Sequence, residues 1–135
     1  MKIGEIKAEA LMLMGVGGSL TITWSDIDNY KTDSSYAPYI HAMNGAINRC
    51  LSRLQVVGAI EGYTPVTVET DEITELEVPD AVAQLIPLYV VGDVFAMEEP
   101  SVAQNKRNEF EALLDDYVKK CVFQQNETIE IVYGV

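Results

Sequence analysis

The chain has few of the residue types on which most catalytic sites depend. Its 135 residues include one histidine, two cysteines and one tryptophan. His41 lies one position beyond an apolar stripe, so we interpret it as a surface or interface residue and not as a catalytic base. A single histidine can serve a Ser–His–Asp triad, but no GxSxG nucleophile elbow accompanies it. The sequence therefore predicts that the protein is not an enzyme.

Cysteine usage and hydropathy indicate where the protein is made. Cys50 and Cys121 form no CxxC pair, and both lie on apolar stripes of predicted helices, so we expect buried free thiols. The N-terminal MKIGEIKAEALMLM has acidic residues inside its apolar run, which is not typical of a signal peptide. No apolar run approaches the roughly 20 residues that span a bilayer. We expect synthesis in a reducing cytoplasm and no membrane partner.

Basic residues are scarce. Lys and Arg total 9 against 21 Asp and Glu, which gives a formal net charge of −12. Tight binding to nucleic acid phosphates or to an anionic membrane needs basic patches and is disfavoured. Two interpretations of the charge remain: it keeps the protein soluble, or it forms an acidic surface that faces DNA without holding it.

Three possible sites have a simpler structural interpretation. A calcium loop starting at Asp26 would need glycine and glutamate where Lys31 and Ala37 stand. Gly15, Gly17 and Gly18 follow a predicted helix and lack the rest of a nucleotide-binding motif, so they indicate a helix stop. The carboxylates near residues 69–77 can be a metal patch or a solvated arm, and without a histidine beside them we favour the arm. We expect no cofactor and no metal.

Apolar periodicity predicts four helices. The first covers about residues 2–14, and the third covers about 79–97 with a kink at Pro87. The fourth begins at Pro100. The second has the longest stripe, with apolar side chains at steps of four and three. These positions are Tyr36, Ile40, Met43, Ile47, Cys50, Leu54 and Val57.

Alternating patterns predict short β elements. They are a strand near residues 19–24, an acidic β-arm at residues 64–78 (the acidic arm), and a strand-like tail in the segment TIEIVY, 128–133. The tail is too short to be stable alone and needs a sheet edge, in its own subunit or in a neighbour. The predicted fold is mainly α: a small four-helix domain at 1–123 with these β elements, followed by an extended C-terminal tail at 124–135.

The order of four segments along the chain carries a resemblance to a known family. A short N-terminal helix precedes a long helix containing YAPYIHAMNGAINRCLSRL, then a polar arm, and last VPDAVAQLIPLYVVGDVFAMEEPSVAQNKRNEFEALLDDY. This layout resembles the head–tail connector proteins of tailed bacteriophages, also called adaptor or head-completion proteins, from about Lys2 to Tyr117. Its most specific residues lie in the last segment. They are Leu85-Ile86-Pro87, Tyr89, Gly92-Asp93, Asn108-Glu109-Phe110-Glu111 and Leu114.

The resemblance implies a structural role in the virion neck. Such a subunit forms a homo-oligomeric ring of about twelve copies through one repeated heterologous interface. The ring lies below the portal protein, extends the channel for double-stranded DNA and holds the next neck or tail protein, such as a stopper or tail terminator. We therefore expect a virion protein at the portal vertex, assembled in the host cytoplasm.

Specific residues are assigned to these roles. We expect charges on the fourth helix to pair across the ring interface: Lys106, Arg107, Glu111 and Asp115. The acidic arm is expected to line the lumen or meet the tail-side partner through Glu69, Asp71, Glu72 and Glu75. The tail is expected to dock on the portal or a neighbour by strand addition, through Ile129, Ile131 and Tyr133.

Two other functions remain open. The chain can be another neck or tail-completion subunit. It can also be an acidic regulatory protein that mimics DNA, which predicts a monomer or dimer with carboxylates spaced along one face.

Overall fold

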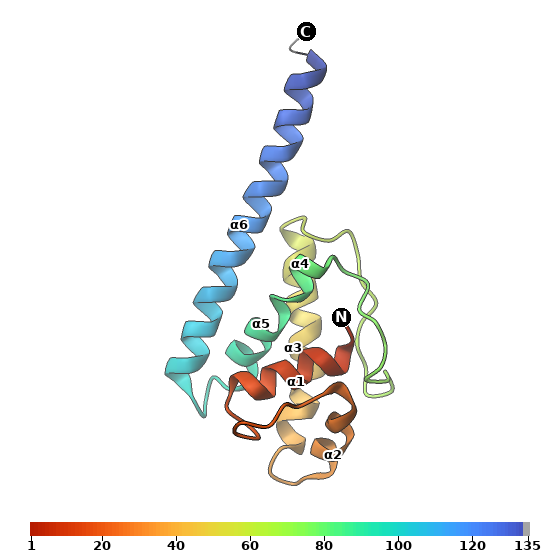
Figure 1. The fold of residues 1–135 in the computed structure, drawn as a ribbon, viewed down its shortest axis with the longest axis vertical. Helices are drawn as coiled ribbons and strands as arrows, with labels where there is room; N and C mark the ends of the chain where they lie inside the picture. Colours follow the sequence, from red (N-terminus) through yellow and green to blue (C-terminus); the bar gives the residue numbers. More distant parts are fainter. Residues whose placement is uncertain (134–135) are drawn as a thin grey trace.

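A computed structural model describes the backbone of residues 1–133 and the side chains of residues 1–122. The described chain is mainly helical, as predicted (Figure 1). In order the elements are α1 (Ile3–Leu13), the 3-10 turn η1 (Trp24–Asp26), α2 (Ile27–Thr32), α3 (Ala37–Val56), α4 (Asp80–Ala83), α5 (Ile86–Val94) and α6 (Pro100–Tyr133).

Helix α3 confirms the clearest prediction. Ile40, Met43, Ile47, Cys50 and Leu54 are buried along one stripe. The helix ends just before Gly58, which adopts a φ of 79°. The Gly58 N–H then donates to the Gln55 carbonyl oxygen at 3.1 Å, and the Ala59 N–H donates to that of Leu54 at 2.9 Å. These two bonds form a Schellman motif, which satisfies carbonyls that the helix leaves free.

Pro87 divides the predicted third helix into two. Helix α4 ends at Ala83, and α5 begins at Ile86 with Pro87 in its first turn, where the missing N–H is not needed. Helix α5 packs against α1, α3 and α6 and is buried on most sides. A single kinked helix was therefore the wrong description: the proline starts a new helix.

Helix α6 lies against α5 and then continues past the rest of the fold (Figure 1). The Phe110 ring is buried and packs edge-to-face on Tyr89, with 5.2 Å between ring centroids. Gly92 allows this close packing, since a Cβ there would lie 3.2 Å from the Ala103 carbonyl oxygen and 3.3 Å from the Arg107 Cβ.

The β predictions are wrong for the described residues. No strand forms within residues 1–133; the nearest feature is an isolated bridge between Lys2 and Glu75. Near 19–24 the alternation does not describe a half-buried strand, because Ile22 is buried but Leu20 is 73% exposed. Residues 27–32 form the short helix α2.

The C-terminal segment also differs from the prediction. Residues 128–133 continue α6 up to Tyr133 instead of forming an extended strand. A lone strand leaves its backbone groups unpaired, whereas a helix pairs them within the segment. The side chains assigned to docking, Ile129, Ile131 and Tyr133, lie outside the described side chains.

Candidate functional site

The acidic arm is held to the N-terminus of α1 by backbone hydrogen bonds. The N–H groups of Ile3 and Gly4 donate to the carbonyl oxygens of Thr74 and Glu72 at 2.9 and 2.8 Å. These donors have no partner within their own helix, because the first turn of any helix leaves its N–H groups free. The arm therefore caps α1, which explains how a segment without strands is kept in place.

Gly4 permits this contact. A Cβ at Gly4 would lie 2.8 Å from the Trp24 Cβ and 2.9 Å from the Glu72 Cβ. The arm and η1 thus approach the α1 backbone more closely than any side chain would allow.

A buried ion cluster links the same elements. The Glu72 Oε1 atom accepts from Lys7 Nζ at 2.9 Å and from Lys31 Nζ at 2.6 Å. The side chains of Lys7 and Glu72 are 1% and 5% exposed. Burial lowers the pKa of Lys7, against the opposing effect of Glu72. Burial would also lower the pKa of Lys31, but hydrogen bonds to Glu72 and Asp28 outweigh it and raise that pKa.

This cluster changes the assignment of Glu72. It was expected in a lumen or at a partner surface, but its side chain is buried, and two lysines balance its charge. Glu75 is 63% exposed and pairs with the Met1 ammonium at 3.0 Å. Glu69 and Asp71 are exposed, so of the four expected arm residues these two project freely into solvent.

Sequence reasoning missed the ion cluster, although a signal was present. Lys7 stands four residues after Ile3 and three before Ala10, which is a core position of α1. A lysine there requires a buried carboxylate partner, because an unpaired buried charge is very costly. The sequence did not show which carboxylate that would be.

The four charges expected at a ring interface divide into two pairs. Arg107 donates to the Gly92 carbonyl oxygen, and Glu111 accepts from Arg53 Nη2 of α3 at 2.9 Å, so both contact their own subunit. Lys106 pairs with Glu109 at 3.3 Å and Asp115 with Lys119 at 2.8 Å, both within α6. Of the four residues, only Lys106 and Asp115 form their ion pairs within α6 and not with another part of the subunit.

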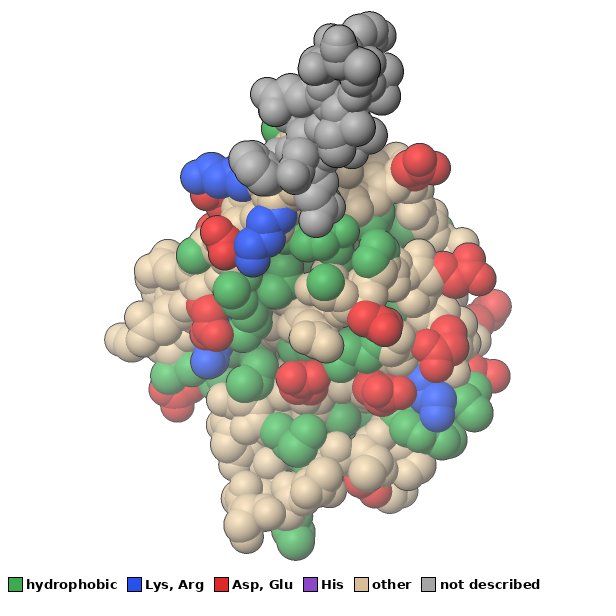
Figure 2. All heavy atoms as spheres, turned by 45° about the horizontal axis from the view of Figure 1, so that its top comes forward, with side chains coloured by type: hydrophobic (Ala, Val, Ile, Leu, Met, Phe, Trp, Pro, Cys, Tyr) green, Lys and Arg blue, Asp and Glu red, His purple; other side chains and the backbone are tan. Residues whose placement is uncertain are grey.

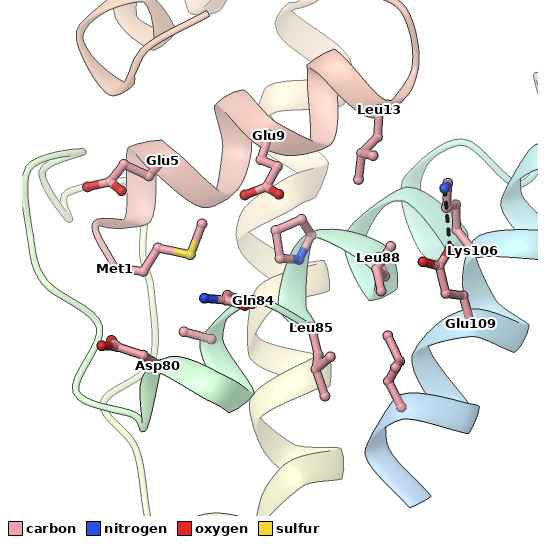
Figure 3. A pocket seen from close by; sticks show the side chains of 13 residues that line it. Met1, Glu5, Glu9, Leu13, Asp80, Gln84, Leu85, Leu88, Lys106 and Glu109 are labelled. Carbon is pink, nitrogen blue, oxygen red and sulfur yellow. Dashed lines mark hydrogen bonds and ion pairs between the residues drawn. The ribbon is translucent and has the colours of Figure 1, made fainter. Parts of the chain in front are cut away.

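An amphipathic groove lies between α1, the α4–α5 segment and α6. It encloses about 650 Å³. Figure 3 shows Glu5 and Glu9 projecting from α1, Leu85 and Leu88 between the helices, and the Lys106–Glu109 pair on α6. The lining also includes one further carboxylate, Asp80, and two further apolar side chains, Leu13 and Leu113. Partial burial and the neighbouring Glu5 raise the pKa of Glu9 above its ordinary value.

The other residues considered from the sequence have ordinary structural roles. His41 is exposed, and Cys50 is buried, which raises the pKa of its thiol. Each aspartate of the rejected calcium loop has its own local partner. Asp26 accepts from the Thr23 N–H, Asp28 pairs with Lys31, and Asp33 accepts from the Ser35 N–H. Among the described residues no cluster of three or more His, Cys, Asp or Glu side chains is arranged to hold a metal ion.

The charge of the surface is unbalanced. On the face seen in Figure 2, Asp and Glu side chains are spread widely, with few Lys and Arg side chains between them. Within the described residues, no helix combines the length and the apolar character that crossing a membrane requires.

Comparison with known proteins gives no match to a family model, to a curated protein or to a solved structure.

Proposed function

We propose that this chain is a structural subunit of a bacteriophage neck, a head–tail connector that assembles into a ring below the portal. The observation that carries the proposal is the helix–proline–helix unit of α5 and α6. Leu85, Tyr89 and Gly92 on α5, with Phe110 and Leu114 on α6, bear the sequence resemblance to connectors. In the fold Tyr89 packs on Phe110 and Gly92 lies against α6, while Leu85 and Leu114 are buried in the core.

The shape of α6 is suited to assembly. Its first half is anchored in the core through Ala103, Phe110 and Leu114, and its second half extends past the rest of the fold (Figure 1). At the start of the projecting part, the side chains of Lys119 and Lys120 are 74% and 75% exposed. A neighbouring copy can contact this surface, as assembly into a ring of identical copies requires.

The charge of −12 suits a channel through which DNA passes. An acidic wall repels phosphates, whereas basic contacts would hold the duplex and release it only with counterion uptake. Glu69 and Asp71 are the arm residues that remain available for a lumen or for the tail-side partner, since Glu72 is buried. In this role the protein works by assembly and needs no catalytic chemistry.

Negative-stain electron microscopy tests the proposal. The purified protein is imaged alone and after mixing with the portal protein encoded by the same phage. We expect rings with a central hole, alone or on the portal. Particles that stay monomeric and leave the portal bare would contradict a connector, and a tight complex with a basic DNA-binding enzyme would then support the DNA-mimic alternative.

A further inference from the structure

Two strongly exposed lysines stand next to each other on α6. Within the described residues most Lys and Arg side chains are committed to their own subunit: Lys7 and Lys31 to Glu72, Arg49 to Asp93, Arg53 to Glu111, and Arg107 to Gly92. Lys2 lies over the Trp24 ring. Lys119 and Lys120 of α6 differ, because their side chains are 74% and 75% exposed.

These two lysines have only weak partners. Lys119 pairs with Asp115 at 2.8 Å and Lys120 with Asp116 at 3.8 Å, one turn earlier on the same helix. Exposed pairs of this kind contribute little to stability and exchange readily for a better partner. Val122, which is 50% exposed, adds an apolar side chain beside them.

The groove between α1, α4–α5 and α6 has the complementary chemistry. Glu5, Glu9, Asp80 and Glu109 give it four carboxylates, while Lys106 is its one lysine. The Met1 ammonium at its edge is already paired with Glu75. Leu113, 42% exposed, provides an apolar edge beside Leu85 and Leu88. A helix that carries two lysines next to a valine matches both parts of this lining.

Lys119 cannot reach Glu109 in the groove of its own chain. Glu109 and Lys119 lie on the same helix, and ten residues of helix separate them by about 15 Å along the axis. A contact between them therefore requires two molecules. The two patches differ, so the contact can repeat head to tail from one copy to the next and close into a ring, as the proposed function requires.

We infer that the groove lined by Glu9 and Glu109 binds the Lys119–Val122 segment of α6 from a second copy of this chain. This inference rests on the proposed function and names the surfaces that would join the ring. It replaces Arg107 and Glu111 as interface residues, because those two are used inside the subunit.

Charge reversal on each side tests the inference. The helix variant is Lys119→Glu with Lys120→Glu, and the groove variant is Glu9→Lys with Glu109→Lys. All four positions lie on helix surfaces, and Glu and Lys have similar helix propensities, so both variants should fold. Circular dichroism and thermal unfolding check this. Glu69→Lys with Asp71→Lys is the matched control for the groove variant, since it makes the same change of charge at positions outside the groove.

Sedimentation velocity over a range of concentrations up to the millimolar level measures self-association. We expect the wild type and the control to associate, and each variant alone to associate at least roughly tenfold more weakly because like charges then meet. An equal mixture of the two variants should associate again, since each supplies the charge that the other lacks. The chain carrying all four changes should associate like the wild type, and its net charge is the same.

Three outcomes would overturn the inference: a wild type that stays monomeric throughout, variants that associate as strongly as the wild type, or a mixture that does not regain association. Electron microscopy with the portal distinguishes a failure of the proposed interface from a failure of the proposed connector function. Rings that form equally well from both variants would leave the connector role intact and place the interface elsewhere. Self-association through the groove by a protein that ignores the portal would support the interface and contradict the connector.

Discussion

Phe110 and Glu72 are both buried, but for different physical reasons. Phe110 lies in the helical core, where it packs on Tyr89 among apolar side chains of α3, α5 and α6. Glu72 belongs to the acidic arm, and its carboxylate pairs with two lysines. The α1 backbone holds the segment that contains it. The core is stabilised by apolar area removed from water, while the arm adds directional polar contacts to the burial of Val66 and Leu76. The comparison predicts two kinds of response to mutation.

The largest effect is expected in the core. Phe110→Ala removes a fully buried ring from the α5–α6 contact and leaves a cavity, which should lower the free energy of unfolding by about 3–5 kcal/mol. Urea unfolding followed by circular dichroism measures it. Leu113→Ala, at a 42% exposed position of the same helix, is the control and should cost much less. Equal losses from Phe110→Ala and Leu113→Ala would contradict the core assignment.

The second-largest effect on stability is expected in the ion cluster of Lys7, Lys31 and Glu72. Glu72→Gln leaves Lys7 buried without a carboxylate, and breaking a buried pair in this way costs roughly 3 kcal/mol. The double variant Lys7→Met with Glu72→Leu removes both buried charges and should recover much of that loss. Unfolding curves of the single and double variants decide it. A double variant less stable than Glu72→Gln would show that the charges stabilise the arm beyond satisfying each other.

Asn48 offers a local test of the arm. Its side chain donates to the Val66 carbonyl oxygen and accepts from the Val66 N–H, both at 2.8 Å. Asn48→Ala leaves these groups unpaired, at a cost of about 1–3 kcal/mol, and should loosen the arm more than the core. Hydrogen exchange should speed up at Val66 while α3 stays protected. Faster exchange along all of α3 would mean that arm and core unfold together.

The smallest effect concerns the groove. The pKa of Glu9 is raised, so the folded state binds its proton more tightly than the unfolded state does. Its unfavourable contribution is therefore present at neutral pH and is relieved as pH falls through the folded-state pKa toward the ordinary value. Glu9→Gln should raise stability slightly at neutral pH and have no such effect in acid. Thermal unfolding at several pH values checks this, and a loss of stability at neutral pH would contradict it.

The helices that pack through a long apolar stripe could be predicted from the sequence. The apolar stripe of α3 is a local signal and is present as expected, and Gly58 ends the helix in a Schellman motif. Pro87 was recognised as a disturbance, but not as the start of α5. The β predictions relied on alternation alone, which also occurs in segments that have no strand to pair with. Near 19–24 and in the acidic arm, the described structure contains no such strand.

The candidate surfaces were harder to predict, because a charge has a role only once its neighbours are known. Nothing in the sequence distinguishes the roles of the four charged residues Lys106, Arg107, Glu111 and Asp115. In the structure, however, Arg107 donates to the Gly92 carbonyl oxygen and Glu111 accepts from Arg53, both within the subunit. The groove brings together α1, the α4–α5 segment and α6, which are far apart along the chain.

By itself the sequence determined the mainly helical class, the extent of α3 and the strongly acidic character, since these follow from local periodicity and composition. Only the tertiary structure decided that Glu72 is buried against Lys7 and Lys31, and that the lysines of α6 remain exposed beyond an acidic groove. The physical reason is that local conformation depends on nearby residues, whereas burial and ion pairing depend on which distant segments meet.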